Sequence, residues 1–443
     1  MVVCYAYMFD VLLLEKVRHV LAIILSYWWT YTPVILASVS YTLWMDYQRK
    51  KFINGLTWVM LEVIPPPDVP KSPKLAESIF AGLHGTYGGN LAWKKMFFQG
   101  TIPFWFSLET VSHGGEIHFL VRTTDGLRNV VEANIFAQYP DAEIRQVDDY
   151  IDLLPEDLPN NPDYDVFGTE LIFTKDNAYP IKTWREFEEA GGKDEHARID
   201  PIAPLMETMS DMRSGEYLWM QYLIRPTGGD WVKEGQAVVD KVAGKTPVKK
   251  TDPVLWFLGL FLEIIGTLLS AIGFESVQGE EKKEEKKEFS LQKLTPAQKG
   301  ILENVEYKLA RLAFKGGVRI MYVGRKDAFV PSRVNTVIGM FKQFYFNDLN
   351  SFKPNPKAGT KDKGILPWLF PSDSGFFVKS RTLRKKSDFY EAFRKRAFVE
   401  TPVILNTEEL ATLWHLPGIN VQAPLIPRVH AKKGQPPPYL PTS

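Results

Sequence analysis

The feature that most constrains this chain is a run of 26 residues, 20–45, that contains no charged side chain. About 20 predominantly apolar residues are enough to cross the ~30 Å hydrocarbon core of a bilayer, so the run predicts a transmembrane helix. Pro33, near its middle, is tolerated in such a helix. The run is longer than the apolar region of a cleaved signal peptide, which is the alternative interpretation. Arg49, Lys50 and Lys51 follow it and place the bulk of the chain in the cytoplasm.

A second apolar run covers residues 254–274. Its few polar or small residues, among them Glu263 and Ser270, recur at steps of three and four and share one helical face. This pattern predicts an amphipathic helix at a membrane interface. A membrane span with Glu263 at mid-membrane and a buried core helix stay open as alternatives. The predicted interfacial residues are Trp256, Phe257, Phe261, Leu262 and Leu268.

Composition excludes several classes of protein. Lys and Arg (53) nearly balance Asp and Glu (52), so no overall basic field suits generic coating of nucleic acid. Cys4 is the single cysteine, which excludes a disulfide framework and a Cys-based zinc site. Aromatic residues reach 13%, a content typical of proteins that face membranes or make large apolar contacts with partners.

The region after residue 103 alternates between strand and helix periods. Residues 103–111 and 116–123 alternate apolar with polar side chains across Gly114-Gly115, which predicts a hairpin. A helical pattern over 126–139 and two further strands follow. This order predicts a ferredoxin-like (split βαβ) module. The strand 317–325 and its following helix echo 116–123 and its helix, which suggests a second module of the same kind.

The predicted fold class is therefore α+β, with an N-terminal transmembrane helix, two ferredoxin-like modules and an inserted amphipathic helix. The expected organisation is a membrane anchor (1–51), a connector (52–102), a first module (103–198), a second module (199–406) with an insertion (245–293), and a Pro-rich tail (407–443).

A search for catalytic motifs yields no predicted catalytic, cofactor-binding or metal-binding residue. Neither a phosphate-binding loop, G-x-S-x-G nor H-E-x-x-H is present. His113, Glu116 and His118 cluster in HGGEIH, but polar hairpin positions explain them better than a metal site. Asp148-Asp149 is read as a solvated turn, with a metal-holding pair of a glycosyl transferase as the alternative.

One dense basic cluster, interleaved with Phe389, Tyr390 and Phe393, is a candidate contact patch for nucleic acid or anionic lipid. A solvated helix face is the alternative. The cluster consists of Arg381, Arg384, Lys385, Lys386, Arg394, Lys395 and Arg396.

The segment SLETVSHGGEIHFLVRTTDGLRNVVEANIFAQYPDAEI (107–144) resembles the membrane-anchored N-terminal region of conjugation-type, type IV secretion ATPases of candidate-phyla bacteria. Segments 317–329, 337–355 and 409–441 resemble the same region, in the same order. In that family a RecA-like ATPase core follows the Pro-rich run. No position in this chain matches its nucleotide-binding motifs, so no catalytic residue is carried over.

The resemblance implies a docking or organising component of a type IV secretion or conjugation machine, located at the bacterial inner membrane. The implied partners are the membrane, a RecA-like translocase ATPase core and further copies of the chain, without a cofactor. A membrane-bound enzyme such as a glycosyl transferase and a structural channel or surface-assembly subunit remain alternatives.

Overall fold

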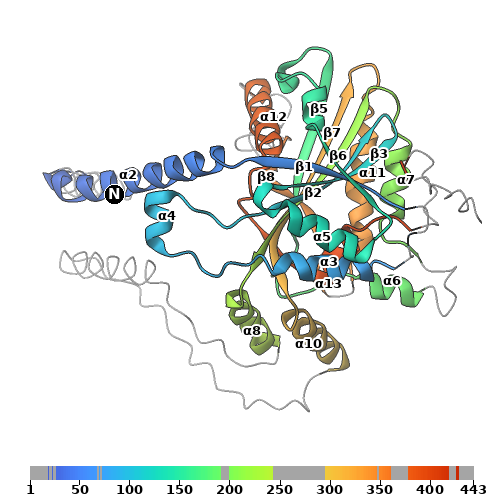
Figure 1. Cartoon of the computed structure of the whole chain (residues 1–443). Helices are drawn as coiled ribbons and strands as arrows, with labels where there is room; N and C mark the ends of the chain where they lie inside the picture. The colour runs from blue at the N-terminus through green and yellow to red at the C-terminus, as the bar shows by residue number, and fades with distance from the viewer. Residues whose placement is uncertain are drawn as a thin grey trace, which may run out of the picture. The chain divides into compact units, whose positions relative to one another are not determined.

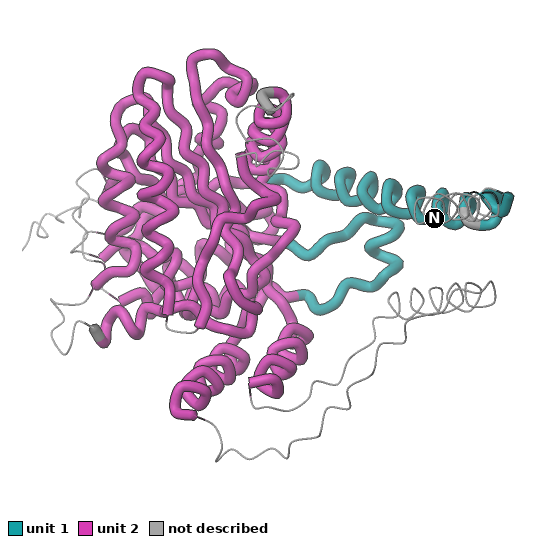
Figure 2. The backbone as a smooth tube through the Cα atoms, turned by 180° about the vertical axis from the view of Figure 1, so that it is seen from behind, with its two compact units in different colours: residues 1–58, 88–104 teal, residues 59–87, 105–443 magenta. Residues whose placement is uncertain are grey.

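The computed structural model describes residues 18, 22, 26–66, 69, 72–190, 199–242, 295–346, 349–360, 378–418 and 426–428. The chain divides into two compact units (Figure 2). Unit 1 comprises residues 1–58 and 88–104, and unit 2 comprises residues 59–87 and 105–443. Unit 1 is therefore made of two separate segments of the chain, and the second of them, residues 88–104, interrupts unit 2.

Unit 1 contains two helices, α2 (Trp28–Asn54) and α4 (Trp93–Gln99). Among the described residues, no helix combines the length and the apolar character that a membrane crossing requires. The predicted transmembrane helix and the single-pass inner-membrane location are therefore wrong. The prediction counted the absence of charge as apolarity, but α2 carries many hydroxyl-bearing residues, such as Thr30, Thr32 and Ser38, and ends in the charged stretch 46–51.

Unit 2 is built on one nine-stranded antiparallel sheet with the strand order β4-β1-β3-β2-β6-β7-β5-β8, and β9 pairs with the start of β7 (Figure 1). The strands are β1 (Trp58–Ile64), β2 (Phe106–His113), β3 (Glu116–Thr124), β4 (Glu143–Val147), β5 (Tyr164–Phe173), β6 (Glu216–Thr227), β7 (Ala313–Arg325), β8 (Phe352–Gly359) and β9 (Val403–Asn406).

The sheet has two halves that meet where β2 pairs with β6, from Phe106↔Ile224 to His113↔Tyr217. From this junction outward, the strands of one half follow in the order β2, β3, β1, β4 and those of the other half in the order β6, β7, β5, β8. Each half thus has the same order of its second, third, first and fourth strand. β3 and β7, whose sequences echo each other, occupy equivalent positions. The predicted hairpin is confirmed, because β2 and β3 pair across Gly114-Gly115.

The predicted pair of ferredoxin-like modules is wrong, because the described strands form one continuous sheet. The predicted first module (103–198) contains both β4 and β5, but β4 belongs to one half of the sheet and β5 to the other. The neighbour of β4 is β1, which lies in a segment that the sequence analysis assigns to a connector.

One face of the sheet is covered mainly by α-helices and carries the larger core. Phe80, Ile135, Met209, Val337 and Leu410 come from these helices and pack with strand residues of the same face. The helices are α3 (Lys74–His84), α5 (Arg128–Gln138), α7 (Ala203–Ser210), α11 (Pro331–Met340) and α13 (Thr407–Leu413). Asn406 begins α13 with a capping box, because its side chain accepts from the Glu409 N–H and Glu409 accepts from the Asn406 N–H.

The opposite face is covered by α12 (Val378–Arg394) and by the short helices η2 (Tyr150–Leu153) and η3 (Leu158–Asn160). Because side chains alternate along a strand, Met60 belongs to this smaller core whereas Leu61 belongs to the larger one. Trp219, at the centre, packs with Tyr150 and Phe393.

Several further helices complete the described structure. The helices α8 (Asp230–Val242) and α10 (Pro296–Leu309) pack together. In the sequence α8 follows β6 and α10 precedes β7, with residues 243–294 between the two helices. The short helices α6 (Trp184–Ala190) and η6 (Phe341–Phe344) contribute Trp184, Phe187, Phe341 and Phe344 to the larger core, and η1 (Asp125–Leu127) precedes α5. The interfacial helix predicted at 254–274, with Trp256, Phe257, Phe261, Leu262 and Leu268, lies outside the described residues.

Candidate functional site

Helices α2 and α4 of unit 1 pack through aromatic side chains. The Tyr41 and Phe97 rings stack with centroids 5.9 Å apart, and the indole Nε1 of Trp44 donates to the Phe97 carbonyl at 2.9 Å. Gly100 ends α4 in the left-handed region (φ 63°), with its Cα directly against the Gln48 backbone. A side chain there would meet the Gln48 carbonyl oxygen, so glycine permits this close approach. We call residues 28–54 and 93–100 the apolar arm.

Most of the large apolar side chains that are exposed in the described structure belong to unit 1. Trp28 and Trp29 are 58% and 61% exposed, and Trp93 and Phe98 on α4 are 55% and 63% exposed. Soluble monomers seldom expose large contiguous apolar surface unless it contacts another molecule. The exposed apolar residues of unit 1 are Tyr27, Trp28, Trp29, Val34, Ile35, Leu36, Val39, Tyr41, Leu43, Trp44, Tyr47, Trp93, Phe98 and Phe104.

A basic zone adjoins this apolar surface within the same unit. Arg49, Lys50 and Lys51 near the end of α2 are exposed, as are Lys94 and Lys95 on α4. Asp46 is their acidic neighbour and lies 3.7 Å from the Arg49 guanidinium. The arm therefore combines an aromatic surface with a net positive charge.

The predicted basic cluster does not form a single free patch. Arg394 pairs with Asp152 and Glu156, Lys386 pairs with Asp165, and Lys395 pairs with Glu391. Arg384 lies 3.9 Å from Asp388, and Arg381 and Lys385 also have partners. Phe389, Tyr390 and Phe393, which interleave with the cluster, are buried in the smaller core.

Arg396, the last residue of the cluster, is fully buried and has a left-handed backbone (φ 48°). Its guanidinium donates to both oxygens of Glu109, at 3.0 and 3.1 Å, and to both oxygens of Asp149. Burial opposes its charged form, but these carboxylates hold its pKa well above the ordinary value. Arg396 is therefore an internal ion-pair residue that fastens the end of α12 to the sheet.

A row of polar side chains crosses the α12 face of the sheet beneath Arg396. Glu109, Gln221, Arg319 and Glu170 are direct cross-strand partners on β2, β6, β7 and β5. Arg319 donates to Glu170 and to the carbonyl oxygens of Ala392 and Ala397, while Gln221 donates to the Phe393 carbonyl. The row thus adds side-chain donors to the Ala392 and Phe393 carbonyls at the end of α12, which also accept from the N–H groups of Ala397 and Arg396.

The residues of HGGEIH lie at the edge of this face. His118 Nδ1 is 2.6 Å from Glu62 on β1, and Arg145 on β4 donates to the other oxygen of Glu62 at 2.7 Å. The ring of His113 lies 5.8 Å from that of His118. Glu116 is exposed at the turn. Within the described residues no group of three ligands that fits a metal ion is found.

Asp148 and Asp149 separate in the structure. Asp149 pairs with Arg396 and accepts from the Ile151 N–H at 3.1 Å as the cap of η2, whereas Asp148 is exposed. A pair of carboxylates that holds one metal must direct both groups to a common point. The occupation of Asp149 by Arg396 weighs against that role.

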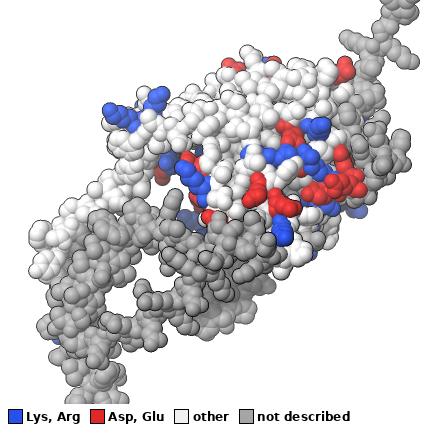
Figure 3. Space-filling model, turned by 90° about the horizontal axis from the view of Figure 1, so that it is seen from below, with Lys and Arg blue, Asp and Glu red and all other residues white. Residues whose placement is uncertain are grey.

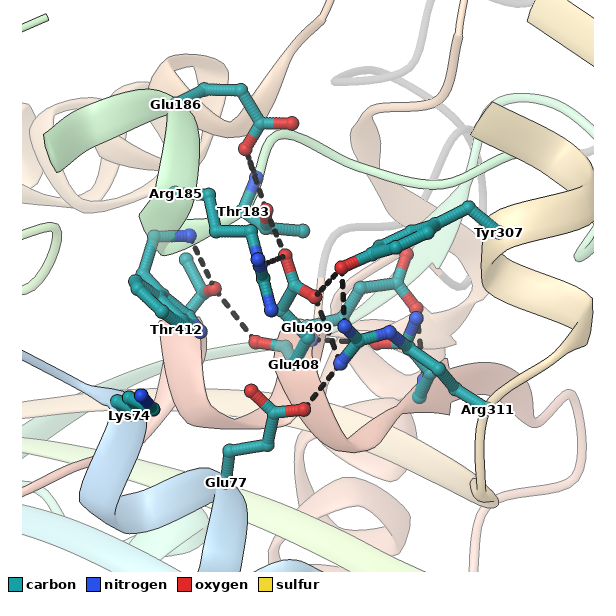
Figure 4. Close-up of polar contacts among 12 residues, drawn as sticks. Lys74, Glu77, Thr183, Arg185, Glu186, Tyr307, Arg311, Glu408, Glu409 and Thr412 are labelled. Atoms are coloured by element: carbon teal, nitrogen blue, oxygen red, sulfur yellow. Dashed lines mark hydrogen bonds and ion pairs between the residues drawn. The ribbon is translucent and has the colours of Figure 1, made fainter. Parts of the chain in front are cut away.

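A second ionic network lies on the other face, around Glu408 of α13 (Figure 4). Glu408 on α13 accepts from Thr183 at 2.7 Å and Tyr307 at 3.1 Å, and pairs with Arg185 and Arg311. Both of its oxygens are occupied by protein donors, so Glu408 acts as a structural junction. The adjacent Glu409 pairs with Lys308 at 3.1 Å, and both side chains are fully buried.

The charges seen from below the molecule are also mixed: Lys and Arg lie next to Asp and Glu on the described surface in Figure 3. This view agrees with the near-balance of charge in the sequence. The charged groups described above are mostly used in internal pairs, so the apolar arm is the candidate functional site. The aromatic residues of 27–31 fall in the charge-free run that predicts a membrane helix. Trp93 and Phe98 fall in the predicted connector, where the aromatic segment WKKMFFQ is their signal.

Residues 100–427 match the family model DUF8128, whose description is "Domain of unknown function". The chain belongs to the DUF8128 family. No curated protein matches the sequence. The DUF8128 region contains β2–β9 and begins at Gly100, the last residue of the apolar arm. The strand β1 and helix α3, which complete one half of the sheet, precede the DUF8128 region.

Proposed function

We propose that this DUF8128 protein is a docking component of a type IV secretion or conjugation-type translocation machine. Its apolar arm binds a RecA-like translocase. The observation on which the proposal depends is the exposed aromatic surface of α2 and α4. The resemblance of 107–144 and three later segments to the N-terminal region of such ATPases supports the choice of machine.

The chemistry of the arm indicates the kind of surface that it fits. Burying apolar area contributes about 25 cal/mol per Å², and Trp and Tyr are the residues that most often dominate binding energy. Trp28, Trp29 and Trp93 are already ordered on helices, so their burial costs little further backbone entropy. The neighbouring Lys and Arg residues favour a partner groove with an acidic rim.

The test is a binding measurement between the full chain and a purified RecA-like ATPase of a type IV secretion machine. Changing both Trp28 and Trp29 to Ala removes two exposed indoles and keeps helix propensity high. We expect affinity to fall about 30-fold, which corresponds to ~2 kcal/mol. Leu383→Ala, at a residue of α12 that is 43% exposed, is the matched control and should leave the affinity unchanged.

Three outcomes contradict the proposal. The first is that the Trp28/Trp29 variant binds the ATPase as tightly as Leu383→Ala does. The second is that the wild-type chain does not bind the ATPase. The third is that the chain hydrolyses ATP without a partner. Sedimentation of the chain alone tests whether the arm binds a second copy of the chain. If the wild-type chain self-associates and the Trp28/Trp29 variant does not, the arm binds a second copy instead of the ATPase.

A further inference from the structure

A small pocket opens on the α12 face of unit 2, beside the ends of β1, β2 and β3. Its volume is about 260 Å³. We call it the His113 pocket. The residues that line it are Glu62, Val111, His113, His118, Leu120, Val147, Asp148, Asp149, Tyr150 and Leu153. Small-molecule sites usually measure ~300–1,000 Å³, so this pocket suits a single side chain better than a whole cofactor.

We propose that the His113 pocket binds a basic side chain, Arg or Lys, of a partner protein. The walls provide the first argument. Val111, Leu120 and Val147 form an apolar lining, and Leu153 is 68% exposed. The methylene stems of Arg and Lys bury readily against such walls while the charged group stays near water.

The carboxylates provide the second argument. Residues 148–165 contain seven Asp or Glu and no Lys or Arg. Four of these acids are neutralised: Asp149 by Arg396, Asp152 and Glu156 by Arg394, and Asp165 by Lys386. Asp148 is exposed, lines the pocket and makes no ion pair with the described residues. It is therefore the carboxylate that is available to an incoming cation.

The charge state of His113 provides the third argument. Burial, together with the nearby His118, lowers the pKa of His113 to about 4. At neutral pH the imidazole is uncharged, so it does not repel a cation. Its Nε2 atom has no hydrogen-bond partner among the described residues. The other titratable groups at the pocket are engaged: Glu62 with His118 and Arg145, and Asp149 with Arg396.

The experiment uses the full chain with selectively labelled histidines and follows the ring signals of His113 and His118 by NMR. The probe is N-acetylarginine amide, and its neutral isostere N-acetylcitrulline amide is the ligand control. We expect the arginine probe to shift the His113 signal saturably at millimolar concentration and the citrulline probe to bind at least 10-fold more weakly.

Asp148→Asn should weaken the arginine probe at least fivefold. The matched control is Asp157→Asn, an acid of the same segment that does not line the pocket. Leu153→Arg should block the probe by supplying a basic side chain from the chain itself. The proposal is overturned if the arginine probe gives no saturable shift, if citrulline binds equally well, or if Asp148→Asn binds like the wild type.

This inference goes beyond the docking function of the arm. The pocket belongs to unit 2, and the probe measurement needs no translocase. The Trp28/Trp29 variant should bind the arginine probe normally, so a failure of either proposal is visible without the other.

Discussion

The buried pair Lys308–Glu409 allows a quantitative test of how unit 2 is held together. The Lys308 Nζ atom lies 3.1 Å from Glu409, and neither side chain is exposed to solvent. Lys308→Met keeps the apolar stem but leaves a buried carboxylate without its cation. Removing one partner of such a pair costs about 3–5 kcal/mol of the free energy of unfolding. This is a large share of the ~5–15 kcal/mol that stabilises a typical domain.

A double variant separates the charge from the packing. In Lys308→Met with Glu409→Gln no charge is buried. The N–H groups of Asn406 and Ile181 donate to different oxygens of Glu409, so the single Gln oxygen can accept from one of them. We therefore expect the double variant to recover part of the loss, with a coupling energy of about 2–3 kcal/mol. Lys299→Met, at an exposed position of the same helix, is the control.

The effect should depend on pH. Burial raises the pKa of Glu409 even with Lys308 present. A carboxyl whose folded pKa exceeds its unfolded value of ~4.3 binds more protons when folded, so the stability falls as pH rises through that interval. Lys308→Met raises the folded pKa further, and its penalty should be larger at pH 8 than at pH 5. Urea denaturation, monitored by Trp fluorescence at pH 5 and at pH 8, measures the free energy of unfolding of each variant. A penalty below 1 kcal/mol, or a double variant as unstable as the single one, refutes the reasoning.

Three further changes probe the arm and the sheet. Gly100→Ala places a Cβ against the Gln48 carbonyl oxygen and should speed amide exchange in α4. Gly88→Ala, with nothing within 4 Å, should not, and equal exchange in the two variants contradicts this packing. Arg396→Lys cannot reproduce the fork that binds Glu109 and Asp149 and should cost about 2–4 kcal/mol in urea, against less than ~0.5 for the exposed Lys395→Ala. Asn406→Ala removes the cap of α13 and should cost about 1 kcal/mol by the same measurement, and an unchanged midpoint counts against the cap.

Local patterns predict much of unit 2. The alternation around Gly114-Gly115 identifies β2 and β3, and helical spacing identifies α5, because both signals depend only on neighbouring residues. The sheet as a whole is not predictable in this way. Whether β5 pairs with β4 or with β7 depends on contacts between residues about 150 positions apart, which leave no local pattern.

The side-chain roles show the same limit. Arg396 stands in a basic segment that looks solvated, and only its contact with Glu109, 287 residues away, explains its burial. A run without charge predicts a membrane helix, but it also fits a helix such as α2, whose hydroxyl-bearing and aromatic side chains are exposed. The His113 pocket depends on the approach of β1, β3 and the 148–153 segment, so HGGEIH alone does not reveal it.

The central claim is that the apolar arm is the surface that binds the translocase, and site-specific photocrosslinking tests it most directly. A photoreactive phenylalanine analogue replaces Trp93 on the arm or, in a separate protein, Leu383 on α12; both side chains are exposed in the free chain. The account predicts that light joins the Trp93 position to the RecA-like ATPase in the mixture and that the Leu383 position gives no such product. Crosslinking from Leu383 but not from Trp93 would contradict it.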